Sequence, residues 1–177
     1  MSEADDVRLV HETLAGNLKA FEQLVDRYQK QVYNVAFRIT GNAADAEDVA
    51  QSAFLKAFEK LRSFNPRFKF FSWLYRIAMN EALNSEKRQR YHDTLDESTV
   101  AGEGMEEQVD RDGIIQRCIQ RLTPDHRSVL VLRHFEDLSY EEIAETLHLP
   151  VKTVRSRLFS ARTVLRELLT QQGLTLE

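Results

Sequence analysis

The sequence predicts an all-α protein made of two small helical domains joined by a flexible acidic linker. Three observations support this prediction. Glycine and proline are scarce, at six and three of 177 residues. Apolar residues recur at intervals of three and four, the period of a helix, and rarely at the interval of two that marks a strand. One stretch near the middle of the chain differs in composition from the rest.

The helical period covers six segments of the chain: residues 18–40, 44–61, 72–90, 113–122, 124–136 and 139–168. Breaks at Gly41-Asn42 and Asn65-Pro66 separate the first three. Cap signals mark the starts of three helices. We expect Ser72 to cap one helix, Thr123 followed by Pro124 to begin another, and Ser139 with Glu142 to form a capping box.

The unusual stretch is residues 92–112, which carry eight acids and one base, a net charge of minus seven. Charge is nearly balanced elsewhere, with 14 bases and 12 acids in residues 1–91 and nine bases and eight acids in residues 113–177. High net charge with few apolar residues is typical of a solvated connector. We therefore expect domains at 1–91 and 113–177, joined by a linker at 92–112.

Several classes of protein are not expected. Nothing near the N-terminus resembles a secretory signal, and no run of eighteen apolar residues occurs, so we expect a cytoplasmic protein without membrane insertion. Cys118 falls in an apolar helical pattern and is expected to lie in the core. The five histidines show no i, i+4 pair and no partner cysteine, so no metal site is expected. No cofactor is expected either.

The C-terminal segment has the spacing of a helix-turn-helix, with a turn at 147–150 and a second helix from Val151. On a helical wheel, one face of the second helix is apolar and the neighbouring face carries Lys152, Arg155, Phe159, Arg162 and Arg166. Residues 151–166 contain five bases and no acid, which favours binding of this face to DNA in the major groove. The alternative is a solvated charged face with Phe159 packed on a neighbouring helix.

The stretch RFKFFSWLYRIAMN, residues 67–80, concentrates aromatic and basic residues. Its helix is expected to place Trp73, Arg76, Asn80, Asn84 and Lys87 in one stripe. Aromatic faces stack on unpaired bases, cations follow the phosphates, and amides reach base edges, so the stripe predicts binding of single-stranded nucleic acid. The alternative is that the aromatic residues, Trp73 included, pack between helices.

Residues 43–61 are expected to form a helix whose acidic side carries Asp45, Asp48, Gln51, Leu55 and Glu59. A leucine exposed among acids favours docking of a protein partner, although Leu55 also suits the boundary of the core. A metal-dependent nuclease would use Asp45 and Asp48, but neither a histidine nor a nucleophile accompanies them. No catalytic residue is therefore expected, and the chain is not expected to be an enzyme.

In this order, three motifs resemble the extracytoplasmic-function (ECF) group of bacterial RNA polymerase sigma factors, within the sigma-70 family. They are AFEQLVDRYQKQVYNVAFRITGNAADAEDVAQSAFLKAF, FFSWLYRIAMNEALN and LTPDHRSVLVLRHFEDLSYEEIAETLHLPVKTVRSRLFSAR, which together cover most of the chain. The resemblance implies a sigma factor that binds core RNA polymerase and directs promoter recognition, DNA opening and transcription initiation. The alternatives are a stand-alone helix-turn-helix transcriptional regulator and the nuclease.

The resemblance also implies roles for individual residues. The segment with Asp45, Asp48, Gln51 and Leu55 would dock on the clamp helices of the beta-prime subunit, with the beta flap as a further contact of the polymerase. The minus-ten element would be melted and read by the residues Trp73, Arg76, Asn80, Asn84, Lys87 and Arg88. The minus-thirty-five element would be read by the residues Lys152, Arg155, Ser156, Phe159 and Arg162. Promoter DNA and an anti-sigma factor are the other implied partners.

Overall fold

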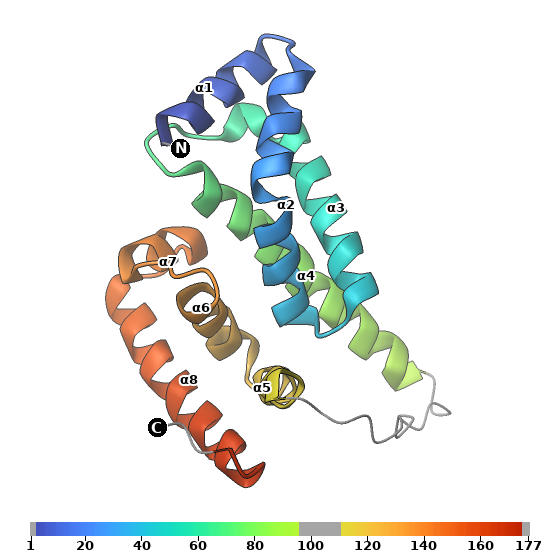
Figure 1. Cartoon of the computed structure of the whole chain (residues 1–177), viewed down its shortest axis with the longest axis vertical. Coiled ribbons are helices and arrows are strands. Elements are labelled where there is room, and N and C mark those ends of the chain that lie inside the picture. The colour runs from blue at the N-terminus through green and yellow to red at the C-terminus, as the bar shows by residue number, and fades with distance from the viewer. Residues whose placement is uncertain (1–2, 96–110, 175–177) are drawn as a thin grey trace.

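The computed structural model of the chain describes residues 3–95 and 111–174, which form eight α-helices and contain no strand. An N-terminal bundle comprises α1 (Glu3–Leu14), α2 (Leu18–Thr40), α3 (Ala43–Glu59), a 3₁₀ turn η1 (Leu61–Ser63) and α4 (Phe70–Leu95) (Figure 1). A C-terminal bundle comprises α5 (Arg111–Gln120), α6 (Pro124–His134), α7 (Tyr140–Leu147) and α8 (Val151–Gln171). The all-α prediction is confirmed, whereas most of the predicted linker lies outside the described residues.

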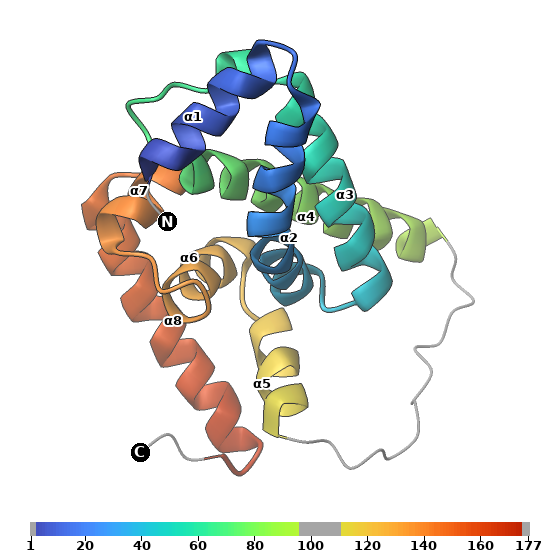
Figure 2. The same cartoon turned by 45° about the horizontal axis from the view of Figure 1, so that its top comes forward.

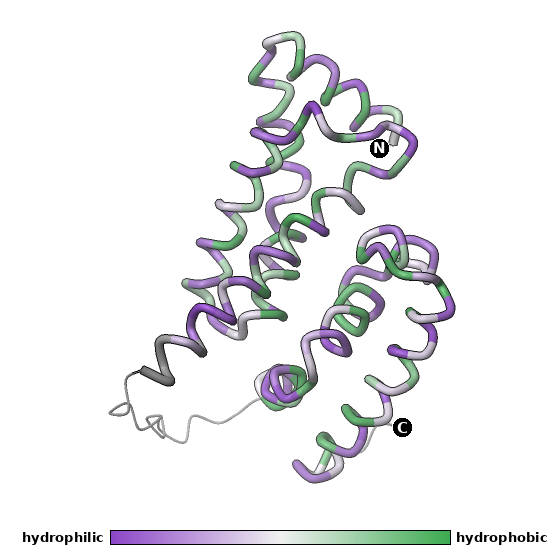
Figure 3. Tube along the Cα trace, turned by 180° about the vertical axis from the view of Figure 1, so that it is seen from behind, coloured by the Kyte–Doolittle hydropathy of each residue, from purple (hydrophilic) through white to green (hydrophobic). Residues whose placement is uncertain are grey.

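The N-terminal bundle packs α2, α3 and α4 on one another, and α1 covers one end of them. Apolar and polar positions alternate with the helical period along each helix (Figure 3), so the inward faces supply the core. Leu24, Ile39 and Leu74 are fully buried there. Helix α1 was not predicted, although it buries Leu9 and Val10.

The C-terminal bundle begins its helices at the predicted caps. The Thr123 side chain accepts a hydrogen bond from the His126 amide (3.3 Å), with Pro124 as the first residue of α6. Both hydrogen bonds of the capping box between Ser139 and Glu142 are present at the start of α7. The turn between α7 and α8 spans residues 148–150, one residue shorter than predicted because Leu147 ends α7. Cys118 is buried, as predicted.

The two bundles pack against each other, with α2 against α5 and α6, and α4 against α7 (Figure 2). Arg127 of α6 is the central contact, because its guanidinium is fully buried. It donates to Ile39 O (2.8 Å) and to a carboxylate oxygen of Glu86 (2.8 Å), both in the N-terminal bundle. The remaining donors reach the carbonyls of Ile119 (3.2 Å), Gln120 (2.7 Å) and Leu122 (3.0 Å). The Arg127 side chain therefore makes hydrogen bonds to both bundles and stabilises their contact.

A second contact forms where α2 ends at Gly41, whose φ of +74° is unfavourable for other residues. The Gln120 side chain donates to Arg38 O (3.0 Å), and a Cβ on Gly41 would lie 2.9 Å from it. Gln116 donates to Phe37 O (3.3 Å) and accepts from the Arg38 guanidinium (2.8 Å). The carbonyls at the end of α2 are therefore satisfied by side chains of the other bundle.

A third contact joins the start of α4 to α7. Lys69 pairs through Nζ with Glu142 (2.7 Å), and its backbone amide donates to Glu145 Oε1 (3.2 Å). The prediction that Ser72 caps this helix is wrong, because α4 begins at Phe70 and Ser72 lies within its first turn. The amide of Lys69, just before the helix, donates instead to a carboxylate of the other bundle.

Candidate nucleic-acid and protein interfaces

Helix α8 is held by its apolar face. Val154, Leu158 and Ala161 are buried against the rest of the C-terminal bundle, where α8 packs on α5, α6 and α7. The α7–α8 turn requires His148 to adopt a left-handed conformation (φ +53°), which ends α7 and sets the direction of the second helix. The neighbouring face of α8 is consequently directed away from the bundle.

That face brings together the residues predicted to read duplex DNA. Lys152, Arg155, Ser156 and Phe159 are all exposed, and Arg162 is half-buried. The Phe159 ring is 75% exposed, so it does not pack on a neighbouring helix in the described part of the chain. An apolar ring among cations at the surface is suited to a thymine methyl in the major groove.

Two of the cations are oriented by neighbours. Arg155 lies over the Tyr140 ring, 5.6 Å from its centroid, and Arg162 Nε donates to His134 Nε2 (3.1 Å). Partial burial, together with the charges of Arg162 and Arg133, lowers the pKa of His134, which favours the neutral ring that accepts this hydrogen bond. The guanidinium groups are thereby held on the exposed side of α8.

The predicted stripe on α4 is divided in two. Asn80, Asn84, Lys87 and Arg88 are exposed. Asn80, Asn84 and Lys87 line a depression of about 430 Å³ together with Lys56 of α3 and Lys60, which directly follows α3. Lys56 forms an ion pair with Glu81 (2.6 Å).

Lys56 and Lys60 were not predicted as site residues. Their i, i+4 spacing at the end of α3 was a usable signal, but nothing local shows that α3 lies beside α4. Amide donors and acceptors rimmed by cations can contact both base edges and phosphates.

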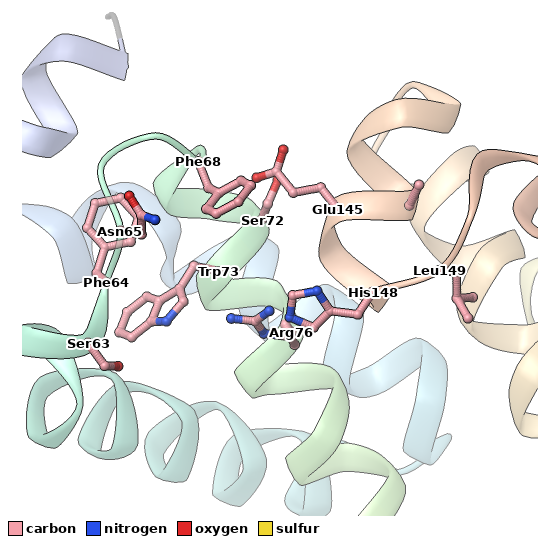
Figure 4. Close-up of a pocket in the computed structure, with 11 residues that line it drawn as sticks. Ser63, Phe64, Asn65, Phe68, Ser72, Trp73, Arg76, Glu145, His148 and Leu149 are labelled. Carbon is pink, nitrogen blue, oxygen red and sulfur yellow. The ribbon is translucent and has the colours of Figure 1, made fainter.

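The other part of the stripe faces the C-terminal bundle. Trp73 is only 8% exposed and packs against Phe64 and Phe70, with ring centroids 5.6 and 5.7 Å apart, so the alternative of a packed tryptophan describes its position. Trp73 and the half-buried Arg76 line a cavity of about 600 Å³ that His148 and other residues of the C-terminal bundle close (Figure 4). Stacking of Trp73 on a base stays a prediction.

The acidic side of α3 is accessible. Asp48, Gln51 and Leu55 are exposed, with Leu55 at 66%, and Asp45 is half-buried and accepts from Gln89 (2.5 Å). Leu55 is therefore not a core residue. It borders an apolar groove between α2 and α3 of about 940 Å³, which is also lined by the aromatic residues Phe21, Tyr33, Phe54 and Phe58. Charge beside an apolar groove suits a partner helix.

Residues 3–95 and 111–174 provide neither a metal-binding cluster nor a membrane-spanning helix. Histidine, cysteine, aspartate and glutamate form no group of three that could hold a metal ion in this part of the chain. Within the same ranges, every helix is too short or too polar to cross a membrane.

Comparisons with known proteins give consistent matches. The family model for sigma-70 region 2 matches residues 24–91, and that for sigma-70 region 4 matches residues 112–165. The chain is 35% identical to the ECF RNA polymerase sigma factor SigW of Bacillus subtilis, over 86% of this chain and 90% of SigW.

Two solved structures are also similar. CnrH, in complex with the cytosolic domain of CnrY, has a TM-score of 0.74 and 27% identity over 94% of this chain and 98% of CnrH. The sigma factor RpoE of Bartonella quintana, in complex with the anti-sigma factor NepR, has a TM-score of 0.70. Its sequence identity is 26%, over 86% of this chain and 98% of RpoE.

Proposed function

Since this chain belongs to the ECF group of the sigma-70 family of RNA polymerase sigma factors, we propose that it binds core RNA polymerase and directs promoter recognition, DNA opening and transcription initiation. One observation carries the proposal: a single chain presents the amide and cation surface of α4 on one bundle and the basic face of α8 on the other. A stand-alone helix-turn-helix regulator would not need the α4 surface.

We assign the docking on polymerase to α3. Asp45, Asp48, Gln51 and Leu55 would contact the clamp helices of the beta-prime subunit, and the beta flap would contact the C-terminal bundle. The exposure of this side and the apolar groove beside it support the assignment. An exposed leucine next to a groove provides apolar area, while the carboxylates favour a basic partner and select its orientation.

We assign the minus-ten element to α4 and the minus-thirty-five element to α8. Exposed Asn80, Asn84, Lys87 and Arg88 would hold an opened strand, with Trp73 and Arg76 joining when their cavity is accessible. Duplex DNA would be read in the major groove by the residues Lys152, Arg155, Ser156, Phe159 and Arg162. The corresponding domains are residues 1–91 and 113–177, with the acidic residues 92–112 between them.

Three further parts of the proposal follow from the family. The partner in the complex of similar RpoE is an anti-sigma factor, so an anti-sigma protein is proposed as a partner here. A protein that works with RNA polymerase on promoter DNA is proposed to be cytoplasmic. Its role is proposed to be binding and DNA opening, with no catalytic residue and no cofactor.

The deciding experiment separates binding from opening. The double variant Asn80→Ala/Asn84→Ala should copurify with core RNA polymerase as the wild type does, yet fail to open a promoter in permanganate footprinting. Gln171→Ala, an exposed amide at the end of α8, is the control and should open the promoter normally. Normal opening by the double variant would contradict the role of α4. Failure of the wild-type chain to copurify with polymerase would contradict the function as a whole.

A further inference from the structure

A cavity lies between the two bundles and has walls from both. Phe64, Phe68 and Trp73 form the wall of the N-terminal bundle, and Glu145, His148 and Leu149 close it from α7 and the turn that follows (Figure 4). Its volume of about 600 Å³ falls within the roughly 300–1,000 Å³ that is usual for small-molecule sites. The cavity therefore has a suitable size and exists only while the bundles are in contact.

Two polar groups in this cavity have no partner among the described residues. Ser72 is 2% exposed, and its buried Oγ makes no hydrogen bond. The guanidinium of Arg76 has neither a hydrogen-bond partner nor an ion-pair partner among the residues that the structure describes. Buried hydroxyl groups are nearly always hydrogen-bonded, so an unpaired one beside a cavity indicates a missing partner.

The distribution of charge in the cavity selects the ligand. Arg76 and His148 point toward each other at one end, whereas Glu145 reaches toward Ser72 and Phe68 at the other (Figure 4). Glu145 is already engaged by the Lys69 amide (3.2 Å). The end with Arg76 is therefore suited to an anionic group, and the three aromatic side chains are suited to a planar ring.

We infer that this cavity binds a small planar aromatic anion. The ring would lie against Phe64, Phe68 and Trp73, the anionic group would accept from Arg76, and Ser72 would hydrogen-bond a polar atom of the ring system. Because Glu145, His148 and Leu149 form the opposite wall, a bound ligand would hold the bundles together. If the proposed function is correct, the ligand would also keep Trp73 and Arg76 from DNA, which makes the cavity an inhibitory effector site.

Trp73 is the single tryptophan of the chain, so it reports binding directly. The full chain would be labelled with 5-fluorotryptophan, which gives one fluorine NMR signal, and titrated with indole-3-acetate and with its neutral analogue indole-3-acetamide. The signal should shift to saturation, and the acetate should bind about tenfold more tightly than the acetamide, the factor expected of one charge-assisted hydrogen bond. No shift up to millimolar probe, or equal binding of the two, would overturn the inference.

Variants test each wall separately. Arg76→Gln should abolish the preference for the acetate, whereas Arg121→Gln, an exposed arginine outside the cavity, should preserve it. Ser72→Ala, which removes only a hydroxyl group, should weaken binding of both probes. Unchanged binding in both Arg76→Gln and Ser72→Ala would place the probe elsewhere and overturn the inference.

The role of the second bundle has its own test. Lys69→Glu places a third carboxylate against Glu142 and Glu145, so it should separate α7 from α4 and weaken both probes about tenfold. Lys19→Glu, an exposed lysine on α2, is the matched control. Because these titrations use the chain without polymerase or DNA, their failure would leave the proposed function standing. Failure of the wild-type chain to copurify with polymerase would leave the binding result standing.

Discussion

Replacing Glu136 with glutamine should change how stability depends on pH. Glu136 lies between α6 and α7 and accepts a hydrogen bond from the Tyr75 hydroxyl of α4 (3.0 Å), across the contact between the bundles. Burial raises the pKa of Glu136 from 4.5 to about 7, a rise that the Tyr75 hydrogen bond opposes and the charge of Asp137 reinforces. The folded protein therefore holds this proton more tightly than the unfolded chain does.

The sign of the effect follows from that difference. The Glu136 contribution to stability is fully present below about pH 4.5, the pKa of an unburied glutamate, and is lost as pH rises through about 7. The full pKa difference corresponds to an upper limit of about 3 kcal/mol. Since the carboxylate is only half-buried, solvent screening reduces the expected effect to about 1–2 kcal/mol.

The measurement is urea unfolding followed by Trp73 fluorescence at pH 5.0 and pH 8.5. Glutamine keeps an oxygen that accepts from Tyr75, but carries no charge at either pH. The free energy of unfolding of Glu136→Gln, minus that of the wild type, should rise by about 1–2 kcal/mol between the two pH values. The exposed Glu141→Gln on α7 is the control and should show no such rise. A difference for Glu136→Gln that is constant or falls with pH would refute the reasoning.

Three further predictions concern other contacts. Arg127→Met removes the donor from five acceptors and should cost about 3–5 kcal/mol; calorimetry showing less than about 1 kcal/mol would contradict it. Gly41→Ala places a Cβ against the Gln120 side chain at a positive φ, whereas Gly173 has a similar φ with open space around it. Gly41→Ala should therefore lower the stability of the protein more than Gly173→Ala does. Equal losses of stability in thermal unfolding would argue against the close approach of Gly41 to Gln120. Arg155→Ala should cost about 1–3 kcal/mol of discrimination between promoters that differ upstream, measured by in vitro transcription, whereas a uniform loss would indicate a phosphate contact.

Local signals predicted much of the fold. The segment predicted at residues 18–40 is α2 (Leu18–Thr40), because its apolar period is long and Gly41 ends it. The capping box of Ser139 and the cap of Thr123 were predicted because both partners lie within three residues of each other. The exposed face of α8 followed from the helical period alone, since its apolar side had to be buried.

Contacts between distant segments could not be predicted in this way. Ser72 has the residue type of a cap, but α4 begins at Phe70. The amide just before that start, on Lys69, is satisfied by Glu145, 76 residues away in sequence. Trp73 was placed correctly on its helix, yet its burial depends on neighbours that its own helix does not reveal. The burial of Arg127 carried no local signal, because its partners come from three separate stretches of the chain.

Because the Lys69 amide donates to Glu145 of α7, the start of α4 is ordered only while α7 lies against it. Terminal turns of helices fray easily, and the first amides of a helix have no hydrogen-bond acceptor within the helix, so only groups outside it can satisfy them. If the bundles separated, the Lys69 amide would hydrogen-bond to water instead of to Glu145, at little enthalpic cost. Residues 65–69 would gain conformational entropy. We expect amide hydrogen exchange at the start of α4 to quicken whenever the bundles part, even though no residue of that turn has been changed.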